Sequence, residues 1–553
     1  MGSVGLAVVG IVSLVLAYRF YGRFLATKIF SILPDRPTPA HELEDGIDYL
    51  PTNKFVLFGH HFASIAGTGP IVGPAIAVIY GWLPALLWIL VGSIFLGGVH
   101  DFGALVVSLR HQGRSIGDLA DQLVGPRARM LFLLVAFFLL ILVLAVFALV
   151  IAALFINNPK AVFPSFALIV VAMILGMLIY RSPIGLVPAT IIGLALMFGS
   201  IWFGLGHPLG AGITENGWVL ILLAYAFVAS VLPVWFLLQP RDYINSFGLY
   251  LGLGLMYVGL FVLRPAMAAP AVQAHPEGAP PMLPFLFILV ACGAISGFHS
   301  LVSSGTTVKQ VNSEKDTKFI GYGSMLVEGA LALVVLLACT AGLGSPESWH
   351  ARYASWTAAS GLQAKLGAFV QGGGAFLAAL GIPSTVGETL VSVTVVAFAM
   401  TSLDSATRLT RFIVSELGAK AGASFTKNRF IASGIAVGCA LALVLIPLGE
   451  KSTGMVLWPV FATTNQILAC LALLIVSVYL RRQGKPIIYT LLPVLFMLII
   501  TSWAMGLNLV SWTGSGVWIL GVAGTIIFIA QWWFILEGLQ ALARRTETEA
   551  ANN

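Results

Sequence analysis

Several ionisable residues lie inside long apolar stretches of the sequence, where a charged side chain is costly. They are His60, His61, His100, Asp101, His299 and Glu328. Such residues usually face the interior of a helix bundle or a water-filled cavity, and they are functional candidates by default. Because histidine titrates near neutral pH, histidines and carboxylates at comparable depth favour a proton relay.

A metal or cofactor site is the alternative use of the same side chains. The sequence has no HExxH motif, and adjacent His60 and His61 point about 100° apart on a helix, so they are poorly placed to share an ion. The four cysteines occur singly, without a CxxC pair. We therefore expect no metal and no cofactor. The alternative that stays open is a membrane-embedded enzyme built on His60, His61, His100, Asp101 and His299.

The elements that position these residues follow from the composition. Only 9% of the 553 residues are charged and 59% are hydrophobic, with a mean hydropathy of +0.97, whereas soluble proteins carry about 25% charged residues. A chain with so few charges is solvated mainly by the lipid bilayer. The pattern of apolar runs predicts an all-α, polytopic membrane helix bundle with about fifteen transmembrane helices.

The positive charges predict how the helices are oriented. In a membrane protein a net charge of +7 indicates basic cytoplasmic loops rather than binding of nucleic acid. The first apolar run, 4–18, lacks a basic leader and a cleavage site, so we expect a retained helix. With alternate loops assigned to opposite sides, 24 of the 29 basic residues fall on one side, which predicts an N-terminus outside and a cytoplasmic C-terminus. The remaining five are Lys160, Arg264, Arg352, Lys365 and Lys451.

Two predicted spans contain helix-breaking residues. In the second span, Gly67, Thr68, Gly69 and Pro70 lie near mid-membrane, where irregular backbone must be buried in protein or line a cavity. The simpler interpretation is close packing, since Gly69 and Gly73 form a GxxxG motif. The seventh span, 218–239, has Pro233 at its centre. The two spans run in opposite directions, a pattern typical of transporters with inverted repeats.

The predicted spans contain no lysine or arginine near their middle. If the protein binds an anion, we therefore expect backbone NH groups, helix N-termini or protonated histidines to meet its charge.

Long motifs across most of the chain resemble the carbon starvation protein A (CstA) family. They are PTNKFVLFGHHFASIAGTGPIVGP (51–74), ASVLPVWFLLQPRDY (229–243), CGAISGFHSLVSSGTT (292–307), IGYGSMLVEG (320–329) and LWPVFATTNQILA (457–469). The resemblance implies uptake of peptides or pyruvate across a bacterial inner membrane, with proton coupling for pyruvate. It also implies the five-plus-five inverted-repeat fold of the amino acid-polyamine-organocation superfamily.

Applied to this sequence, that fold predicts four parts. A peripheral helix and a cytoplasmic loop occupy 1–54, and the two five-helix repeats occupy 55–205 and 206–405. The second repeat carries an extracytoplasmic insertion near 342–384. Peripheral helices occupy 406–553.

The predicted transporter imports a small carboxylate or a peptide by alternating access. The expected substrate-binding residues are Ala66, Gly67, Thr68, Gly69, Pro70, Ser230 and Pro233. The expected ion-coupling residues are His60, His61, Asp101, His299, Ser303, Ser304 and Glu328. The hydroxyl groups of Ser303 and Ser304 are suggested by sodium-coupled relatives of the superfamily, so H⁺ and Na⁺ coupling both remain open, with the histidines and Glu328 favouring H⁺. The sequence does not indicate an oligomeric state.

Overall fold

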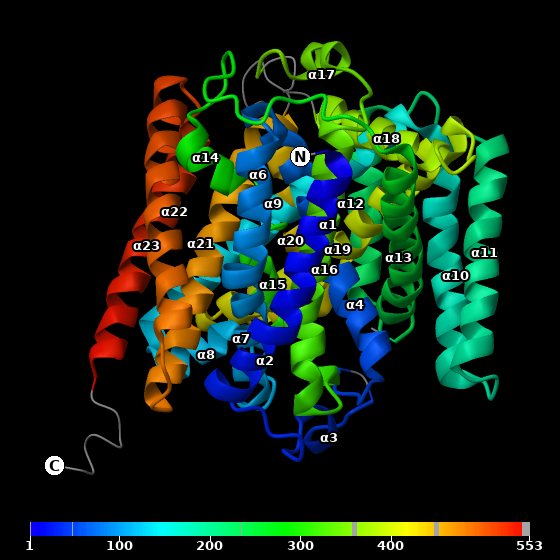
Figure 1. Cartoon of the computed structure of the whole chain (residues 1–553). Coiled ribbons are helices and arrows are strands. Elements are labelled where there is room, and N and C mark those ends of the chain that lie inside the picture. The colour runs from blue at the N-terminus through cyan, green and yellow to red at the C-terminus, as the bar shows by residue number, and fades with distance from the viewer. Residues whose placement is uncertain (1, 47, 234, 357–361, 447–452, 545–553) are drawn as a thin grey trace.

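Long apolar runs of the chain form long helices that stand roughly side by side (Figure 1). The computed structural model describes residues 2–46, 48–233, 235–356, 362–446 and 453–544. The helices of the first half are α1 Ser3–Leu16, α2 Gly22–Phe24, α3 Pro39–Glu42, α4 Lys54–Ala66, α5 Gly69–Ala77, α6 Trp82–Val91, α7 Gly98–Leu109, α8 Ile116–Leu123, α9 Pro126–Asn157, α10 Val162–Arg181, α11 Leu186–Gly206, α12 Glu215–Val231 and α13 Leu238–Leu263. Those of the second half are α14 Met282–Leu289, α15 Gly297–Gly305, α16 Ser324–Thr340, α17 Pro346–Tyr353, α18 Leu362–Ala378, α19 Ser384–Lys420, α20 Arg429–Leu445, α21 Thr453–Arg482, α22 Ile488–Gly514 and α23 Trp518–Ala543.

The protein is an all-α, multi-pass membrane protein. Within the described residues, eleven helical segments are long and apolar enough to cross a membrane, and a bent pair, α4 with α5, makes twelve. The helices α12 and α20 are apolar but shorter. The expected number of about fifteen spans is not established by this count.

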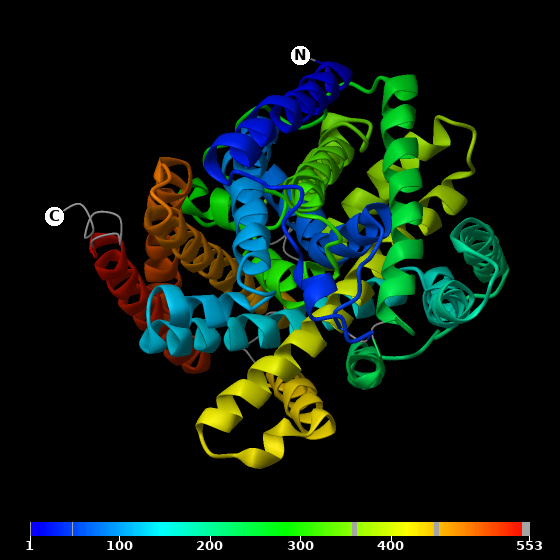
Figure 2. The same ribbon diagram turned by 90° about the horizontal axis from the view of Figure 1, so that it is seen from below.

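The helices differ in how deeply they lie in the bundle. The helices α16 and α21 are almost wholly buried, whereas α11 is largely exposed. Figure 2, seen along the bundle, places the α10–α11 hairpin and the α22–α23 pair at opposite edges. Their outward residues are large and apolar, including Val187, Ile191 and Trp202 on α11 and Val510 on α22. These peripheral helices therefore present a lipid-facing surface.

Two helices near the centre are interrupted. The helices α4 and α5 form a broken span with a bend of 43°, and α14 and α15 are separated by the non-helical residues 290–296. At one end of the bundle, Tyr80 Oη donates to Pro280 O over 2.8 Å, and at the other Thr52 N donates to Gln310 O over 3.1 Å. These contacts join the end of α5 to the start of α14, and the start of α4 to the residues after α15. The two interrupted helices are therefore antiparallel.

The second predicted interruption lies elsewhere in the structure. Helix α12 ends at Val231 and α13 begins at Leu238, so Pro233 lies between two helices rather than in the centre of a span. A proline between two helices removes no ladder hydrogen bond, which is why it is tolerated there. The second interrupted helix of the structure is α14–α15, which the sequence did not single out as broken.

Three arginines assigned to loops lie inside helices. Arg241 belongs to the first turn of α13, and Arg408 and Arg411 belong to α19, which runs without interruption from Ser384 to Lys420. All three side chains are buried. The expectation that no lysine or arginine is available inside the bundle is therefore wrong.

The described parts of the segment 342–384, residues 342–356 and 362–384, fold over the end of the bundle at which α17 lies (Figure 1). An added methyl group at Gly372 would lie 2.1 Å from Ala338 O, so α18 contacts α16 backbone to backbone. Tyr353 Oη donates to Ala75 O of α5 over 2.9 Å. This segment therefore covers the second half of the first interrupted helix. We call this end of the bundle the α17 end, and the opposite one the α3 end.

Candidate functional site

The two interruptions meet at the centre of the bundle. A methyl group added at Gly69 would lie 2.3 Å from Cys292 Sγ, and one added at Gly73 would lie 2.5 Å from Leu289 O. Only a residue without a side chain allows the backbones to approach so closely. The glycines of the first interruption thus hold it against the second.

Gly67 provides the turn between α4 and α5. Its φ of +47° is a conformation that side chains with a Cβ rarely adopt. An added methyl group would also lie 2.8 Å from both a ring atom of Phe147 and Ser402 Oγ. Ser402 Oγ donates to Ser64 O over 3.0 Å, which satisfies a carbonyl near the end of α4. The helices α9 and α19 therefore enclose the first interruption.

Asn465 of α21 holds the second interruption in shape. Its Oδ1 accepts hydrogen bonds from Phe298 N over 2.9 Å and from Ser296 Oγ over 3.2 Å, and its Nδ2 lies 2.9 Å from Ser296 Oγ. An added methyl group at Gly297 would lie 2.4 Å from Asn465 O, so α15 begins directly against α21. Asn465 acts as a helix cap supplied by another helix. It lies in the motif 457–469, but nothing in the spacing identified its role.

Both interrupted helices begin their second half where they meet. The first residue of α5 is Gly69 and the first residue of α15 is Gly297. Helix N-termini carry partial positive charge and favour anions. Thr68 Oγ1 is buried, and it has no hydrogen-bond partner among the described residues. The centre thus combines two helix N-termini with a hydroxyl group that has no hydrogen-bond partner among the described residues.

The structure brings four of the intramembrane ionisable residues together. Asp101 Oδ1 lies 2.7 Å from His100 Nδ1, Asp101 Oδ2 lies 2.8 Å from His299 Nδ1, and His299 Nε2 lies 3.5 Å from Glu328 Oε2. The side chains of all four are fully buried. We call His100, Asp101, His299 and Glu328 the His299 cluster. It joins α7, α15 and α16, and a continuous chain of carboxylates and imidazoles of this kind can hold and pass a proton.

The adjacent histidines of α4 point to different neighbours. His61 Nδ1 lies 2.9 Å from Thr307 Oγ1, while His60 Nδ1 lies 2.7 Å from Asp242 Oδ2 of α13. Among the described residues, no group of three or more His, Cys, Asp or Glu side chains is arranged to hold a metal ion.

Four further predicted residues lie apart from these groups or pair locally. Ser304 Oγ donates to Ser300 O over 2.7 Å and accepts from Ile116 N over 3.0 Å, whereas buried Ser303 Oγ has no partner within the described part of the chain. Ser230 Oγ lies 2.9 Å from Ser433 Oγ of α20. The structure does not bring Ser230 or Pro233 to the first interruption, where Cys292 and its neighbours lie instead.

A second charged group lies between α12, α13 and α19. Arg241 Nη1 donates to Asp404 Oδ2, and Tyr225 Oη donates to the same oxygen over 2.6 Å. Arg241 and Asp404 are buried. We call Tyr225, Arg241 and Asp404 the Arg241 cluster.

The sequence contained a signal for this group. Thr401, Asp404 and Arg408 recur at helical spacing, which would have extended the predicted span at 385–405.

The Arg241 cluster lies beside the first half of the first interrupted helix. Ser64 Oγ donates to Asp242 Oδ2 over 3.2 Å and lies 3.4 Å from Ser405 Oγ. Asp404 follows Ser402 by two residues, which is about 3 Å along a helix. The cluster is therefore next to the central site on its α3 side.

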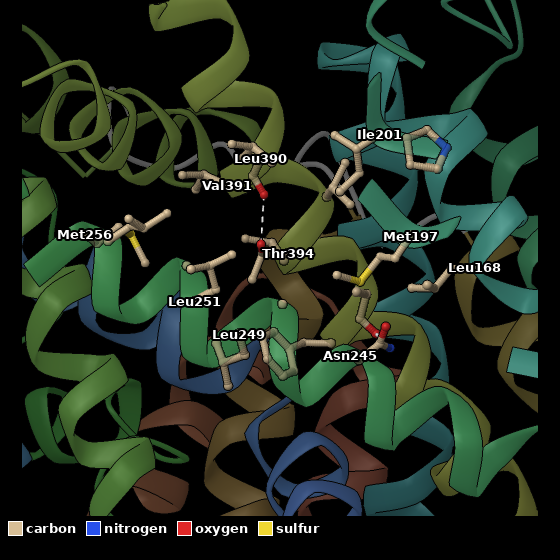
Figure 3. A pocket seen from close by; sticks show the side chains of 18 of the residues that line it. Leu168, Met197, Ile201, Asn245, Leu249, Leu251, Met256, Leu390, Val391 and Thr394 are labelled. Carbon is tan, nitrogen blue, oxygen red and sulfur yellow. Dashed lines mark hydrogen bonds between the residues drawn. The ribbon is translucent and has the colours of Figure 1, made fainter. Parts of the chain in front are cut away.

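Two pockets lie among the helices around this centre. One of about 80 Å³ lies among α10, α11, α13 and α19 (Figure 3), and its labelled lining is apolar except for Asn245 and Thr394. Such a pocket offers little to a charged ligand. The other, of about 780 Å³, is open and has a mixed polar and apolar lining, which includes Lys160, Arg352 and Glu388.

The model of the family "Carbon starvation protein CstA" matches residues 2–345 and 345–504. The chain is 34% identical to the pyruvate/proton symporter BtsT of Escherichia coli K12, covering 90% of this chain and 80% of that protein. It is 34% identical to the peptide transporter CstA of Campylobacter jejuni, covering 91% and 79%, and 32% identical to that of Bacillus subtilis, covering 91% and 90%.

Two solved structures align with most of this chain at low sequence identity. MhsT in complex with L-phenylalanine gives a TM-score of 0.49 at 14% identity, covering 88% of this chain and 99% of that one. A manganese transporter of Eremococcus coleocola gives 0.45 at 12% identity, covering 90% and 99%. With a family model that matches most of its length and relatives above 30% identity, the chain belongs to the carbon starvation protein CstA family of transporters.

Proposed function

We propose that the protein is a proton-coupled importer of a small carboxylate such as pyruvate, or of short peptides, working by alternating access. The relatives named for pyruvate and for peptides take substrates with one feature in common, a carboxylate group. A site that recognises this group accounts for both substrate classes.

The observation that carries this proposal is the meeting of two antiparallel interrupted helices. The N-termini of α5 and α15 lie at the meeting point, and Thr68 contributes a free hydroxyl group. Backbone NH groups at helix N-termini are good partners for a carboxylate. Interrupted helices at the centre of inverted repeats are also where secondary transporters bind their substrates.

The buried ionisable groups beside the two interruptions are proposed to take part in proton transfer. The candidates are Asp101, His299 and Glu328 in the His299 cluster, together with His60 and His61 on α4. Protonation changes the charge of a group in a low-dielectric region, so it shifts the relative energies of the inward and outward states. Coupling to Na⁺ through Ser303 and Ser304 is the second candidate, because Ser303 Oγ is buried without a partner in the described residues.

The two repeats are proposed to differ from the division expected from the sequence. The first would consist of α4–α5, α6–α7, α9, α12 and α13, and the second of α14–α15, α16, α19, α20 and α21. Packing of α9 against α19, and of α12 against α9, α19 and α20, supports this division. The α10–α11 hairpin and the 342–384 segment are then insertions, and α1, α22 and α23 are peripheral.

The α3 end is proposed to face the cytoplasm of a bacterial inner membrane, with the N-terminus outside and the C-terminus inside. Lys160 and Arg352 would then lie in an outward-facing vestibule, the open pocket that Asn158 and Ser392 also line. Ser392 and Ser402 lie on the same helix about 15 Å apart. A substrate anion would reach the centre between α9 and α19.

Uptake into proteoliposomes tests this function. The purified protein should accumulate labelled pyruvate or a labelled dipeptide when a proton gradient is imposed, and unlabelled substrate should abolish the signal by competition. Accumulation driven only by a sodium gradient would establish Na⁺ coupling instead. Failure to transport either substrate under any gradient would reject the proposed function.

A further inference from the structure

We propose that Arg241 binds the carboxylate of the substrate, and that it does so only when Asp404 has taken up a proton. This inference rests on the proposed function and names the step that links substrate to proton. In the present structure the Arg241 guanidinium is neutralised by Asp404. A second carboxylate can replace Asp404 at Arg241 without leaving a net charge only if Asp404 becomes neutral.

The burial of the pair makes this exchange obligatory. The Arg241 and Asp404 side chains are 2% and 0% exposed. Breaking a buried ion pair leaves a charge without a partner, which is strongly unfavourable. Because the guanidinium of arginine stays protonated in proteins, Arg241 requires an anion in every state. That anion is either the Asp404 carboxylate or the carboxylate of the substrate.

The structure leaves one oxygen of Asp404 ready for a proton. Oδ2 accepts from both Arg241 and Tyr225, whereas the buried Oδ1 has no hydrogen-bond partner among the described residues. An unpartnered buried carboxylate oxygen is costly. Protonation forms an O–H bond on Asp404 and removes its charge, and the N–H donors of Arg241 are then free for the substrate carboxylate.

The charged groups around the pair favour replacement of one carboxylate only, that of Asp404. Besides Arg241 and Tyr225, the ionisable groups near Asp404 are Asp242 on α13 and Arg408 one turn further along α19. Asp242 is occupied by His60 of α4 and by Ser64, and Arg408 donates to Leu232 O. Asp404 is therefore the carboxylate that Arg241 can release.

The position of the pair fits transit of substrate between the central site and the α3 end. Ser402, two residues before Asp404, contacts the first interruption, and Ser405 lies 3.4 Å from Ser64 near the end of α4. Arg241 Nη2 also reaches Thr401 Oγ1 at 3.5 Å. A substrate leaving the interruptions toward the α3 end would therefore meet Arg241 next.

The test uses the full-length protein in proteoliposomes with labelled pyruvate. In Asp404→Asn the residue is neutral at every pH, so Arg241 is without a partner unless substrate is bound. This variant should exchange internal for external pyruvate but should not accumulate it in response to a proton gradient. Accumulation at the wild-type level would overturn the proposal.

The double variant Arg241→Gln/Asp404→Asn separates binding from folding, because it removes both charges together and leaves neither unpaired. It should insert and unfold like the wild type, while its KM for pyruvate exchange should rise on the order of 10- to 100-fold, as for loss of a charge-assisted hydrogen bond. The matched control is Arg411→Gln, since Arg411 is buried on α19 but donates to Ser230 O, and its KM should be unchanged. A double variant with an unchanged KM and intact proton dependence would overturn the role of Arg241. Loss of transport by the wild type itself would instead reject the proposed function.

Discussion

The two charged clusters differ in the kind of positive charge that they contain. In the His299 cluster, every member titrates, so it can hold one proton more or fewer without binding any other ion. In the Arg241 cluster, the positive charge is permanent, and a buried anion must always accompany it. The first cluster can therefore store a proton by itself, whereas the second can take a proton only in exchange for another anion. A symporter needs the second property.

The clusters also differ in what they hold together. The His299 cluster joins α7, α15 and α16 around the second interrupted helix. The Arg241 cluster joins α12, α13 and α19. Next to it, Ser64 and His60 of the first interrupted helix contact Asp242 of α13. Each interruption thus has its own ionisable neighbours. The following variants distinguish the roles of the two interruptions and of the two clusters.

The largest effect on uptake is expected where the two interruptions meet. In Gly69→Leu the new side chain would start 2.3 Å from Cys292 Sγ and would force the two interruptions apart. Uptake of labelled substrate should be abolished, while the protein still inserts into the membrane, since overpacking typically costs about 1–3 kcal/mol. The matched control is Gly254→Leu, because nothing lies within 4 Å of the Cβ position of Gly254. Normal uptake by Gly69→Leu would contradict the central site.

The next effect concerns the second interruption alone. Asn465→Ala leaves Phe298 N and Ser296 Oγ without their shared partner, and an unsatisfied buried donor costs about 1–3 kcal/mol. The KM for uptake should rise and the thermal unfolding temperature should fall. Asn465→Asp keeps the acceptor for Phe298 N and should lie between Asn465→Ala and the wild type. Equal transport by all three proteins would show that α15 does not need this cap.

A moderate effect is expected from neutralising the His299 cluster. Glu328→Gln retains the size of the side chain but cannot lose a proton. The variant should still accumulate substrate, with a lower rate and an altered dependence of uptake on pH, whereas Asp404→Asn should not accumulate it at all. This contrast can be measured with both variants in parallel over a series of external pH values. If Glu328→Gln turned out to be the exchange-only variant, the assignment of the two clusters would be reversed.

The smallest effect is expected at Tyr225. Tyr225→Phe removes the hydrogen bond that Tyr225 Oη donates to Asp404 and the one that it accepts from Arg241, and it leaves the bond from Arg241 to Asp404 in place. A single hydrogen bond contributes about 0.5–1.5 kcal/mol. Because the Asp404 carboxylate is then less stabilised, it should accept a proton more readily, and the pH range of uptake should move to higher pH. An unchanged pH profile would indicate that Tyr225 does not contribute to the exchange.

The sequence predicted the class of fold and the position of the first interruption. The glycines at 67 and 69, the two prolines that follow and the intramembrane histidines were all recognisable as residue types at unusual places. The family and the transporter function agree with the expectations that the long motifs implied.

The second half of the site was not predictable in the same way. Proline marks an interruption only when the surrounding helix continues, and Pro233 lies in a connection, while the real interruption at 290–296 contains no proline. Arg241 and Asp404 form an ion pair although 163 positions separate them in the sequence. Taken singly, each was therefore assigned to a loop or to the end of a span. Asn465 caps α15 through a contact that only the packed structure brings about.

Helix α19 gives the protein a mechanical property. Its 37 residues form one uninterrupted helix, about 55 Å long at 1.5 Å per residue. This one helix carries Ser392 in the open pocket, Ser402 at the first interruption and Asp404 in the Arg241 cluster. If Asp404 changes partner as proposed, any tilt of this helix would displace both of its ends together, which would link opening on one side of the membrane to closing on the other.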